Sequence, residues 1–348
     1  MKKLSKTSRS NFITYGIVLA AYLIMQLLVS TGNISSLIKG QLIPICVYAS
    51  AAVSLNLCIG ILGELSLGHA GFMSIGCYVG AIAAAVLESS VPNPILRLVL
   101  AMIVGAIAAA IGGVIIGVPG LKLNGDYLAI VTLAFGEIIK NIFNNFYLGA
   151  DANGLHASVL GDPAGLAEDG KLILGGPMGL SGNDRISTFT AGFILILITL
   201  FIIYNLTDSR TGRAIMAIRD NRIAAESVGI PVTRFKMTAF VISAALAGAA
   251  GTLFAMNYST VVPNKFDFNT SILVLVFVVL GGQGNLLGSI IAAAALTVLP
   301  EALRGFSDYR MLIYAIVLIL VMLATNSPQI KQFVTRVLPK KKEDEIHG

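Results

Sequence analysis

The chain has 348 residues, of which 56% are hydrophobic and only 12% carry a charge, and it contains 36 glycines and no tryptophan. A soluble domain carries roughly a quarter charged residues, so this composition excludes a cytosolic enzyme, a disordered protein and a disulfide scaffold. The formal net charge of +6 does not indicate nucleic-acid binding, because no basic stripe interleaved with aromatic residues is present. The composition therefore predicts a polytopic protein of the lipid bilayer.

Long stretches that are nearly free of charge predict membrane-spanning helices, because a bilayer core of ~30 Å needs about 20 apolar residues in helical conformation. Ten such segments follow one another, at 11–29, 41–59, 66–87, 95–118, 126–146, 187–206, 237–258, 271–282, 285–300 and 310–325. The eighth and ninth are short and joined by a Gly-Gly-Gln-Gly-Asn turn, so 271–300 either crosses twice or forms a broken or re-entrant element. We expect an all-α polytopic membrane protein with about ten transmembrane segments and one or more broken helices.

Basic residues in short loops mark the cytoplasmic side of a membrane protein. Fifteen of the 24 Lys and Arg residues fall in three regions, namely the tail 1–10, the loop 207–236 and the tail 326–348. Ten crossings put these regions on one side, so both termini are expected in the cytoplasm and the membrane domain spans 11–325. The loop 147–186, with five acidic against two basic residues, is expected to be external.

Motifs for catalysis or cofactor binding are absent from the sequence. There is no Gly-x-x-x-x-Gly-Lys-Ser/Thr phosphate loop, so any ATP that drives this protein is hydrolysed by another subunit. Cys46, Cys58 and Cys77 lie inside apolar segments and are expected to be buried packing residues. We expect no catalytic residue, no metal site and no cofactor; an intramembrane enzyme would have to rest on Glu64 and His69 alone.

The first informative stretch, residues 56–78, contains five glycines between Gly60 and Gly76, which suits close helix approach and local unwinding. Polar residues at membrane depth are costly unless they line water or find partners. Two interpretations remain open, a tight turn at the cytoplasmic face and a part of a substrate path or gate. The path hypothesis takes Ser66, Gly68 and His69 as candidates.

The second stretch opens the segment 126–146. Asp126 begins this helix and is placed to cap it, while Glu137 lies three turns further on, about 17 Å along the axis. Lys140, at i+3, is the expected partner of Glu137. The pair is either a structural salt bridge or, together with Asp126 and Thr132, a polar part of the translocation path.

The third stretch is the basic loop 207–236. Asp220 is a good helix N-cap, Gly229 a good helix stop and Pro231 a further breaker, so a short helix is predicted near 221–228. Such a helix is either a docking element for a partner or a solvated connector. The residues expected to form the docking element are Arg213, Arg219, Asp220, Arg222, Ala224, Ala225, Glu226 and Gly229.

Three long runs of the sequence resemble a known protein family. GELSLGHAGFMSIGCYVGA (63–81), GDYLAIVTLAFGEIIKNI (125–142) and GRAIMAIRDNRIAAESVGIPVTRFKMTAFVISAALAGAAG (212–251) resemble the LivM-type permease subunits of bacterial branched-chain amino acid ABC importers. The resemblance covers about 56–303. It implies a multi-pass protein of the bacterial inner membrane that works with a related second permease, two cytoplasmic ATPase subunits and an external substrate-binding protein.

The resemblance also implies roles for particular segments. Residues 213–230 match the coupling helix that docks on the ATPases, although Ile223 stands where the broader importer pattern has a glutamate. The implied mechanism is alternating access, with leucine, isoleucine or valine released into a path between two permeases. A urea or short-amide importer shares these motifs and stays an alternative, as does an ATP-independent channel or secondary transporter.

Overall fold

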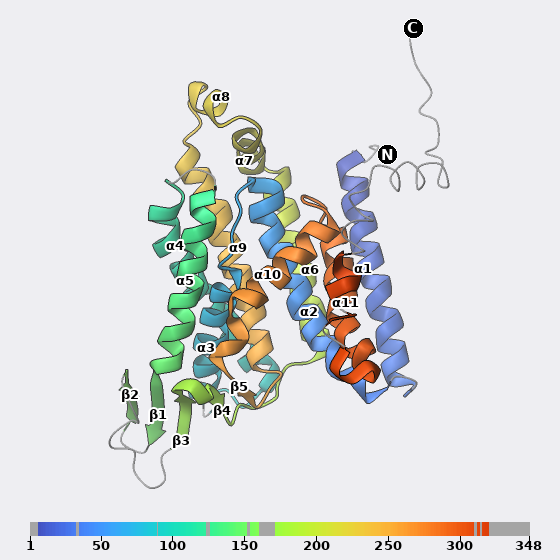
Figure 1. Ribbon diagram of the computed structural model, residues 1–348, viewed down its shortest axis with the longest axis vertical. Coiled ribbons are helices and arrows are strands. Elements are labelled where there is room, and N and C mark those ends of the chain that lie inside the picture. Colours follow the sequence, from blue (N-terminus) through green and yellow to red (C-terminus); the bar gives the residue numbers. More distant parts are fainter. Residues whose placement is uncertain are drawn as a thin grey trace. The chain divides into compact units, whose positions relative to one another are not determined.

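The computed structural model describes residues 6–32, 35–88, 90–122, 126–151, 154–159, 171–309, 312–313 and 315–319. It divides into a large unit, Met1–Thr297, and a small unit, Val298–Gly348. The α-helices are α1 Lys6–Ser30, α2 Ser36–Asn56, α3 His69–Val86, α4 Pro94–Gly120, α5 Asp126–Asn145, α6 Phe189–Asp208, α7 Arg210–Asp220, α8 Arg222–Ser227, α9 Val232–Ala255, α10 Phe268–Gly281 and α11 Leu286–Ala302 (Figure 1). The fold is therefore mostly helical, as expected.

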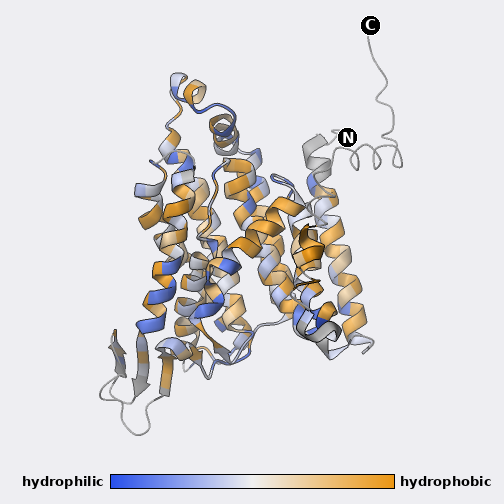
Figure 2. Ribbon diagram, viewed as in Figure 1, coloured by the Kyte–Doolittle hydropathy of each residue, from blue (hydrophilic) through white to orange (hydrophobic). Residues whose placement is uncertain are grey.

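Eight helical stretches are long and apolar enough to cross a membrane among the described residues. They are Asn11–Ser30, Ile38–Leu62, His69–Val86, Pro94–Gly120, Tyr127–Asn145, Phe189–Asp208, Val232–Ala255 and Leu286–Gly305. Figure 2 shows that apolar residues cover most of these long helices. They correspond to the first seven predicted segments and to the ninth.

The eighth predicted segment is a short apolar helix. Helix α10 has 14 residues, or about 21 Å of length, which is less than the ~30 Å of a bilayer core. The double crossing and the broken or re-entrant element in 271–300 both stay predictions. The tenth predicted segment, 310–325, lies largely outside the described residues, as do the tails 1–5 and 326–348.

The core of the large unit lies where α3 packs against α9 and α4. A Cβ added at Gly76 would meet the carbonyl oxygen of Gly248 at 2.0 Å, and one at Gly251 would meet that of Met73 at 1.9 Å. The two backbones are thus in direct contact, a close approach that only glycine permits. Thr252 Oγ1 adds a hydrogen bond to the Gly76 carbonyl at 2.7 Å.

A small antiparallel sheet, which the sequence analysis did not predict, interrupts the helical fold. Its strands are β1 Tyr147–Asp151, β2 Gly154–Ser158, β3 Lys171–Gly175, β4 Leu180–Ser181 and β5 Thr260–Val261, in the order β2-β1-β3-β4-β5. Leu180 of β4 is paired with Val261 of β5, so the sheet joins the predicted external loop to the end of α9. Strands β1 to β3 lie at the opposite end of α5 from α7 and α8 (Figure 1).

Among the described residues, shorter helical turns occur in both units. They are the π-helix η1 Leu57–Leu62, the 3₁₀ turns η2 Gly176–Met178 and η3 Pro263–Phe266, and η4 Leu303–Tyr309 in the small unit. The π-helix η1 prolongs α2 and ends at Gly63, whose φ of +80° is left-handed. Wide turns of this kind often occur at functional sites.

Candidate functional site

Helices α7 and α8 form a hairpin within the predicted docking loop. The predicted helix near 221–228 is confirmed as α8, but Asp220 is not its cap. Asn221 has extended backbone angles, φ −156° and ψ 103°, and its Oδ1 accepts the Ala224 amide at 3.0 Å. Asp220 still belongs to α7 and pairs with Arg219 at 3.0 Å. Gly229 ends the hairpin with φ +83°, as its predicted role as a helix stop requires.

A small apolar core holds the hairpin to the start of α9. Ile218, Ala225 and Val232 are buried together, and Ile230 and Phe235 pack against them. Two other apolar side chains of the hairpin point away from this core, with Ile223 80% and Val228 75% exposed. Both side chains are therefore available for contact with another protein.

Charged side chains also lie on the surface of the hairpin. Arg222 Nε donates to Glu226 Oε1 at 3.0 Å, and Arg213 Nη1 donates to the Asp208 carbonyl at 3.0 Å. Arg213, Ala224, Glu226 and Gly229 are exposed, Arg222 is partly exposed and Ala225 is buried. Of the predicted docking residues, Ala225 thus supports the hairpin from within while most of the others lie on its surface.

Arg219 connects the hairpin to the membrane helices. Its Nη1 donates to the carbonyl oxygen of Gly60, in η1, at 2.8 Å. Its aliphatic stem lies over Gly63, where an added Cβ would meet Arg219 Cγ at 2.5 Å. Because Gly63 has no side chain, α7 can rest directly on the end of η1.

A buried ion pair lies beside this contact. Glu64 Oε1 accepts a hydrogen bond from Lys236 Nζ, and their side chains are only 13% and 7% exposed. Lys236 belongs to the first turns of α9 and comes directly after the hairpin. Glu64, Arg219 and Lys236 line one cavity of about 240 Å³, and a second of about 450 Å³ continues from Gly60 and Glu64 to Gln283.

The structure brings four of the predicted path residues together where residues 63–68 meet α5. Thr132 Oγ1 accepts the Leu67 amide at 3.1 Å, and a Cβ on Gly68 would meet the Thr132 carbonyl oxygen at 1.9 Å. Ser66 and His69 are buried next to them along the chain. His69 Nε2 is 2.8 Å from Ser54 Oγ of α2, so residues 63–69 are fastened to both α2 and α5.

Asp126 and Glu137, the other two path candidates, lie apart from this group. Asp126 is the first residue of α5, as predicted, but its side chain lies outside the described residues. Glu137 pairs with Lys140, which confirms the predicted partner. Its second carboxylate oxygen accepts the Phe268 amide at 3.2 Å, so Glu137 also holds the first residue of α10.

Asp267 caps the same end of α10. Its Oδ1 accepts the Thr270 amide at 2.9 Å and its Oδ2 accepts Asn269 Nδ2 at 2.8 Å. Burial by itself raises the pKa of Asp267, but the hydrogen bonds from Thr270 and Asn269 and the charge of Lys140 outweigh it and leave the pKa lowered. A charged carboxylate therefore stabilises the amide end of this short helix.

Asn56, which the sequence analysis did not single out, fastens the turn between α10 and α11. Its Oδ1 accepts the Gly284 amide at 2.8 Å, and its Nδ2 donates to the Asn285 carbonyl at 3.2 Å and to Ser289 Oγ at 2.8 Å. Asn56 is fully buried. Because Asn56 is a polar residue inside the apolar segment 41–59, its position in the sequence could have identified it as a residue with a buried partner.

Comparison with known proteins identifies the family. The family described as "Branched-chain amino acid transport system / permease component" matches residues 37–322. The chain belongs to this family. The match contains the α7–α8 hairpin, residues 63–69 and the turn between α10 and α11, so the contacts described above are formed within the permease domain.

Among its relatives, this permease is 37% identical over 289 residues to the high-affinity branched-chain amino acid transport system permease protein LivM of Salmonella typhimurium, and equally to LivM of Escherichia coli. These alignments cover 80% of the chain and 66% of either LivM protein, slightly less than two thirds. It is also 26% identical over 296 residues to the ribose import permease protein RbsC of Escherichia coli, covering 81% and 83% of the two chains. No solved structure matches.

Proposed function

We propose that this multi-pass membrane protein is the permease subunit of an ATP-driven importer of the branched-chain amino acids leucine, isoleucine and valine. The observation that carries the proposal is the 37% identity to LivM over 80% of the chain. The family is one of transport permeases, so the chain acts as a transport subunit and not as an enzyme. ATP is hydrolysed by separate partners.

The proposed topology has both termini in the cytoplasm, with about ten crossings between 11 and 325. Residues 1–10 and 326–348 are then cytoplasmic tails, 147–186 is the external loop and 207–236 the cytoplasmic coupling loop. The separation of the α7–α8 hairpin and strands β1 to β3 to opposite ends of α5 supports this arrangement (Figure 1). The basic residues of the coupling loop support its side of the membrane.

The partners of the proposed complex are a related second permease, two ATPase subunits and an external substrate-binding protein. The α7–α8 hairpin is the proposed contact with the ATPases. The exposure of Ile223 and Val228 supports this role. The charged side chains of Arg213, Arg222 and Glu226 on the same hairpin support it too, because exposed charges select a partner of complementary charge.

The proposed coupling route runs from the hairpin through Arg219 and η1 to residues 63–69. A displacement of the hairpin would pull on the Gly60 carbonyl through Arg219 of α7 and on Glu64 through Lys236 of α9, because the hairpin packs against the first turn of α9. Residues 63–69 carry the proposed path residues Ser66, Gly68 and His69, and Thr132 holds them to α5. Asp126 and Glu137 of α5 complete the proposed path.

Substitution of Ala225 tests the coupling role. Ala225 is 4% exposed and its amide donates to the Asn221 carbonyl at 3.0 Å, so Ala225→Pro removes this bond and breaks α8. We expect uptake of labelled leucine, isoleucine and valine to be abolished in cells that express the complete complex, with normal membrane insertion. Ala217→Ser, at an exposed position of α7 outside the predicted docking residues, should transport as the wild type does.

Normal uptake by Ala225→Pro would show that α8 does not couple. Uptake that persists after ATP depletion would favour a channel or secondary transporter. Labelled urea and ribose serve as substrate controls, because a urea importer shares the motifs and the chain is also similar to RbsC. Loss of urea or ribose uptake alone in a deletion strain would keep the coupling role and replace the proposed substrate.

A further inference from the structure

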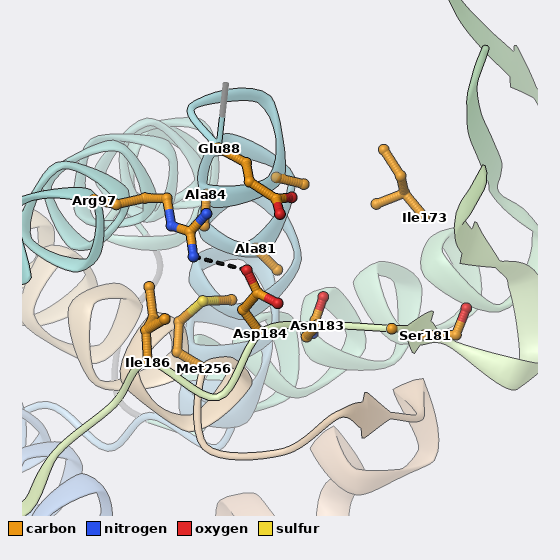
Figure 3. Close-up of a pocket in the computed structure, with 12 residues that line it drawn as sticks. Ala81, Ala84, Glu88, Arg97, Ile173, Ser181, Asn183, Asp184, Ile186 and Met256 are labelled. Carbon is orange, nitrogen blue, oxygen red and sulfur yellow. Dashed lines mark hydrogen bonds and ion pairs between the residues drawn. The ribbon is translucent and has the colours of Figure 1, made fainter. Parts of the chain in front are cut away.

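A cavity of about 130 Å³ lies at the end of the molecule that carries the sheet. The end of α3, the first turn of α4 and residues 181–186 enclose it (Figure 3). A single water needs roughly 10–15 Å³ of such space, and a drug-sized ligand needs roughly 300–1,000 Å³. The cavity is therefore matched to a molecule of a few heavy atoms, such as a free amino acid.

Two of the residues that line this cavity, Arg97 and Asn183, each have a buried hydrogen-bond donor without a partner among the described residues. Arg97 is only 8% exposed, and its Nη2 donates to Asp184 Oδ2 at 2.7 Å. Its Nε is buried and has no hydrogen-bond partner among the described residues, and the same holds for Asn183 Nδ2. Because an unsatisfied buried donor costs free energy, an acceptor that reaches these donors from the cavity would remove that cost.

The residues that line the cavity indicate which kind of acceptor it binds. A planar guanidinium beside an amide NH₂ suits a carboxylate, which accepts several charge-assisted hydrogen bonds. Asp184 is 51% exposed in its side chain and Glu88 stands at the rim, so both are available to an ammonium group. Figure 3 shows the contact between the Arg97 guanidinium and the Asp184 carboxylate, with the side chains of Glu88 and Asn183 drawn nearby.

The remaining wall is apolar. Ala81, Ala84, Ile186 and Met256 line it. Such a surface binds an aliphatic side chain in preference to a polar one. We propose that this cavity binds a free aliphatic amino acid, with its carboxylate on Arg97 and Asn183 and its ammonium group toward Asp184 and Glu88. The inference rests on the proposed function for its biological role, which is to hold the substrate before it enters the membrane domain.

Binding of labelled L-valine to the full chain tests this site. The chain is co-expressed with its partner subunits, reconstituted in nanodiscs and measured without ATP and without the external binding protein. L-valine should bind, and L-valinamide, which lacks the carboxylate, should compete at least tenfold less well. This difference is expected because charge-assisted hydrogen bonds to the carboxylate are the strongest contacts in the site.

Two variants and a control locate the binding. Asn183→Asp has the same shape and replaces a donor by a negative charge, so it should weaken valine binding at least tenfold. Arg97→Gln should do the same, and its thermal unfolding midpoint reports any loss of structure. Asn145→Asp makes the same charge change at the exposed last residue of α5, outside the cavity, and should bind valine normally.

Wild-type affinity in both Asn183→Asp and Arg97→Gln would overturn the inference, as would equal binding of valine and valinamide. No binding to the wild-type chain would also overturn it and would mean that water alone satisfies the two donors. ATP-driven uptake by the wild type is a separate readout. Valine binding by the wild type without ATP-driven uptake would contradict the proposed function and support the site. Uptake by the wild type together with normal valine binding by Asn183→Asp would support the proposed function and contradict the site.

Discussion

The Glu64–Lys236 ion pair is the contact where we expect a single substitution to lower the stability of the protein most. Both side chains are nearly buried, so Lys236→Met leaves a carboxylate without its partner in a low-dielectric site. Breaking a buried pair on one side costs about 3–5 kcal/mol, whereas replacing both partners by apolar groups is often neutral. We expect Lys236→Met to lower the thermal unfolding midpoint in detergent markedly and the double variant Glu64→Leu/Lys236→Met to recover most of it.

The Glu137–Lys140 pair provides the matched control. Glu137 is 33% exposed in its side chain and also accepts the Phe268 amide, so the carboxylate keeps a partner when Lys140 is removed. Lys140→Met should therefore shift the midpoint less than Lys236→Met does. Equal shifts for the two variants would contradict the view that burial makes the Glu64–Lys236 pair the more sensitive one.

At the scale of elements, the turn between α10 and α11 depends on one side chain of α2. Asn56 satisfies the Gly284 amide and donates to Asn285 and Ser289, so Asn56→Leu removes these bonds while keeping the helix. Amide hydrogen exchange of residues 282–289 should become faster, because the hydrogen bonds to Asn56 no longer have to break when the turn opens. Asn269→Leu, in the first turn of α10, removes one exposed bond to Asp267 and should leave exchange at 282–289 unchanged.

The elements also show what local sequence can predict. Helix α8, its stop at Gly229 and the Glu137–Lys140 pair were predictable because each depends on residues within one or two turns. The Glu64–Lys236 pair, the Asn56 contacts and the sheet were not, because they join residues more than a hundred positions apart or strands that acquire partners only in the fold. The cap of α8 was wrong by one residue, since Asp220 stays in α7.

At the scale of the whole molecule, the fold makes the proposed orientation directly testable. Cys46, Cys58 and Cys77 are free and buried, so the wild-type chain should react little with a membrane-impermeant maleimide. Ile223 in α8 and Met178 in η2 are 80% and 71% exposed, and they lie in the proposed cytoplasmic and external loops. Either residue therefore provides a reporter position with low background.

In intact cells, Met178→Cys should be labelled and Ile223→Cys should not, because the reagent reaches the outer face alone. Inside-out vesicles should give the opposite result, and solubilised protein should be labelled at both positions. Labelling of both variants from one side would refute an odd number of crossings between the two loops. Labelling of Ile223→Cys in intact cells and of Met178→Cys in inside-out vesicles would reverse the orientation, and the ATPases would then have to dock elsewhere than on α8.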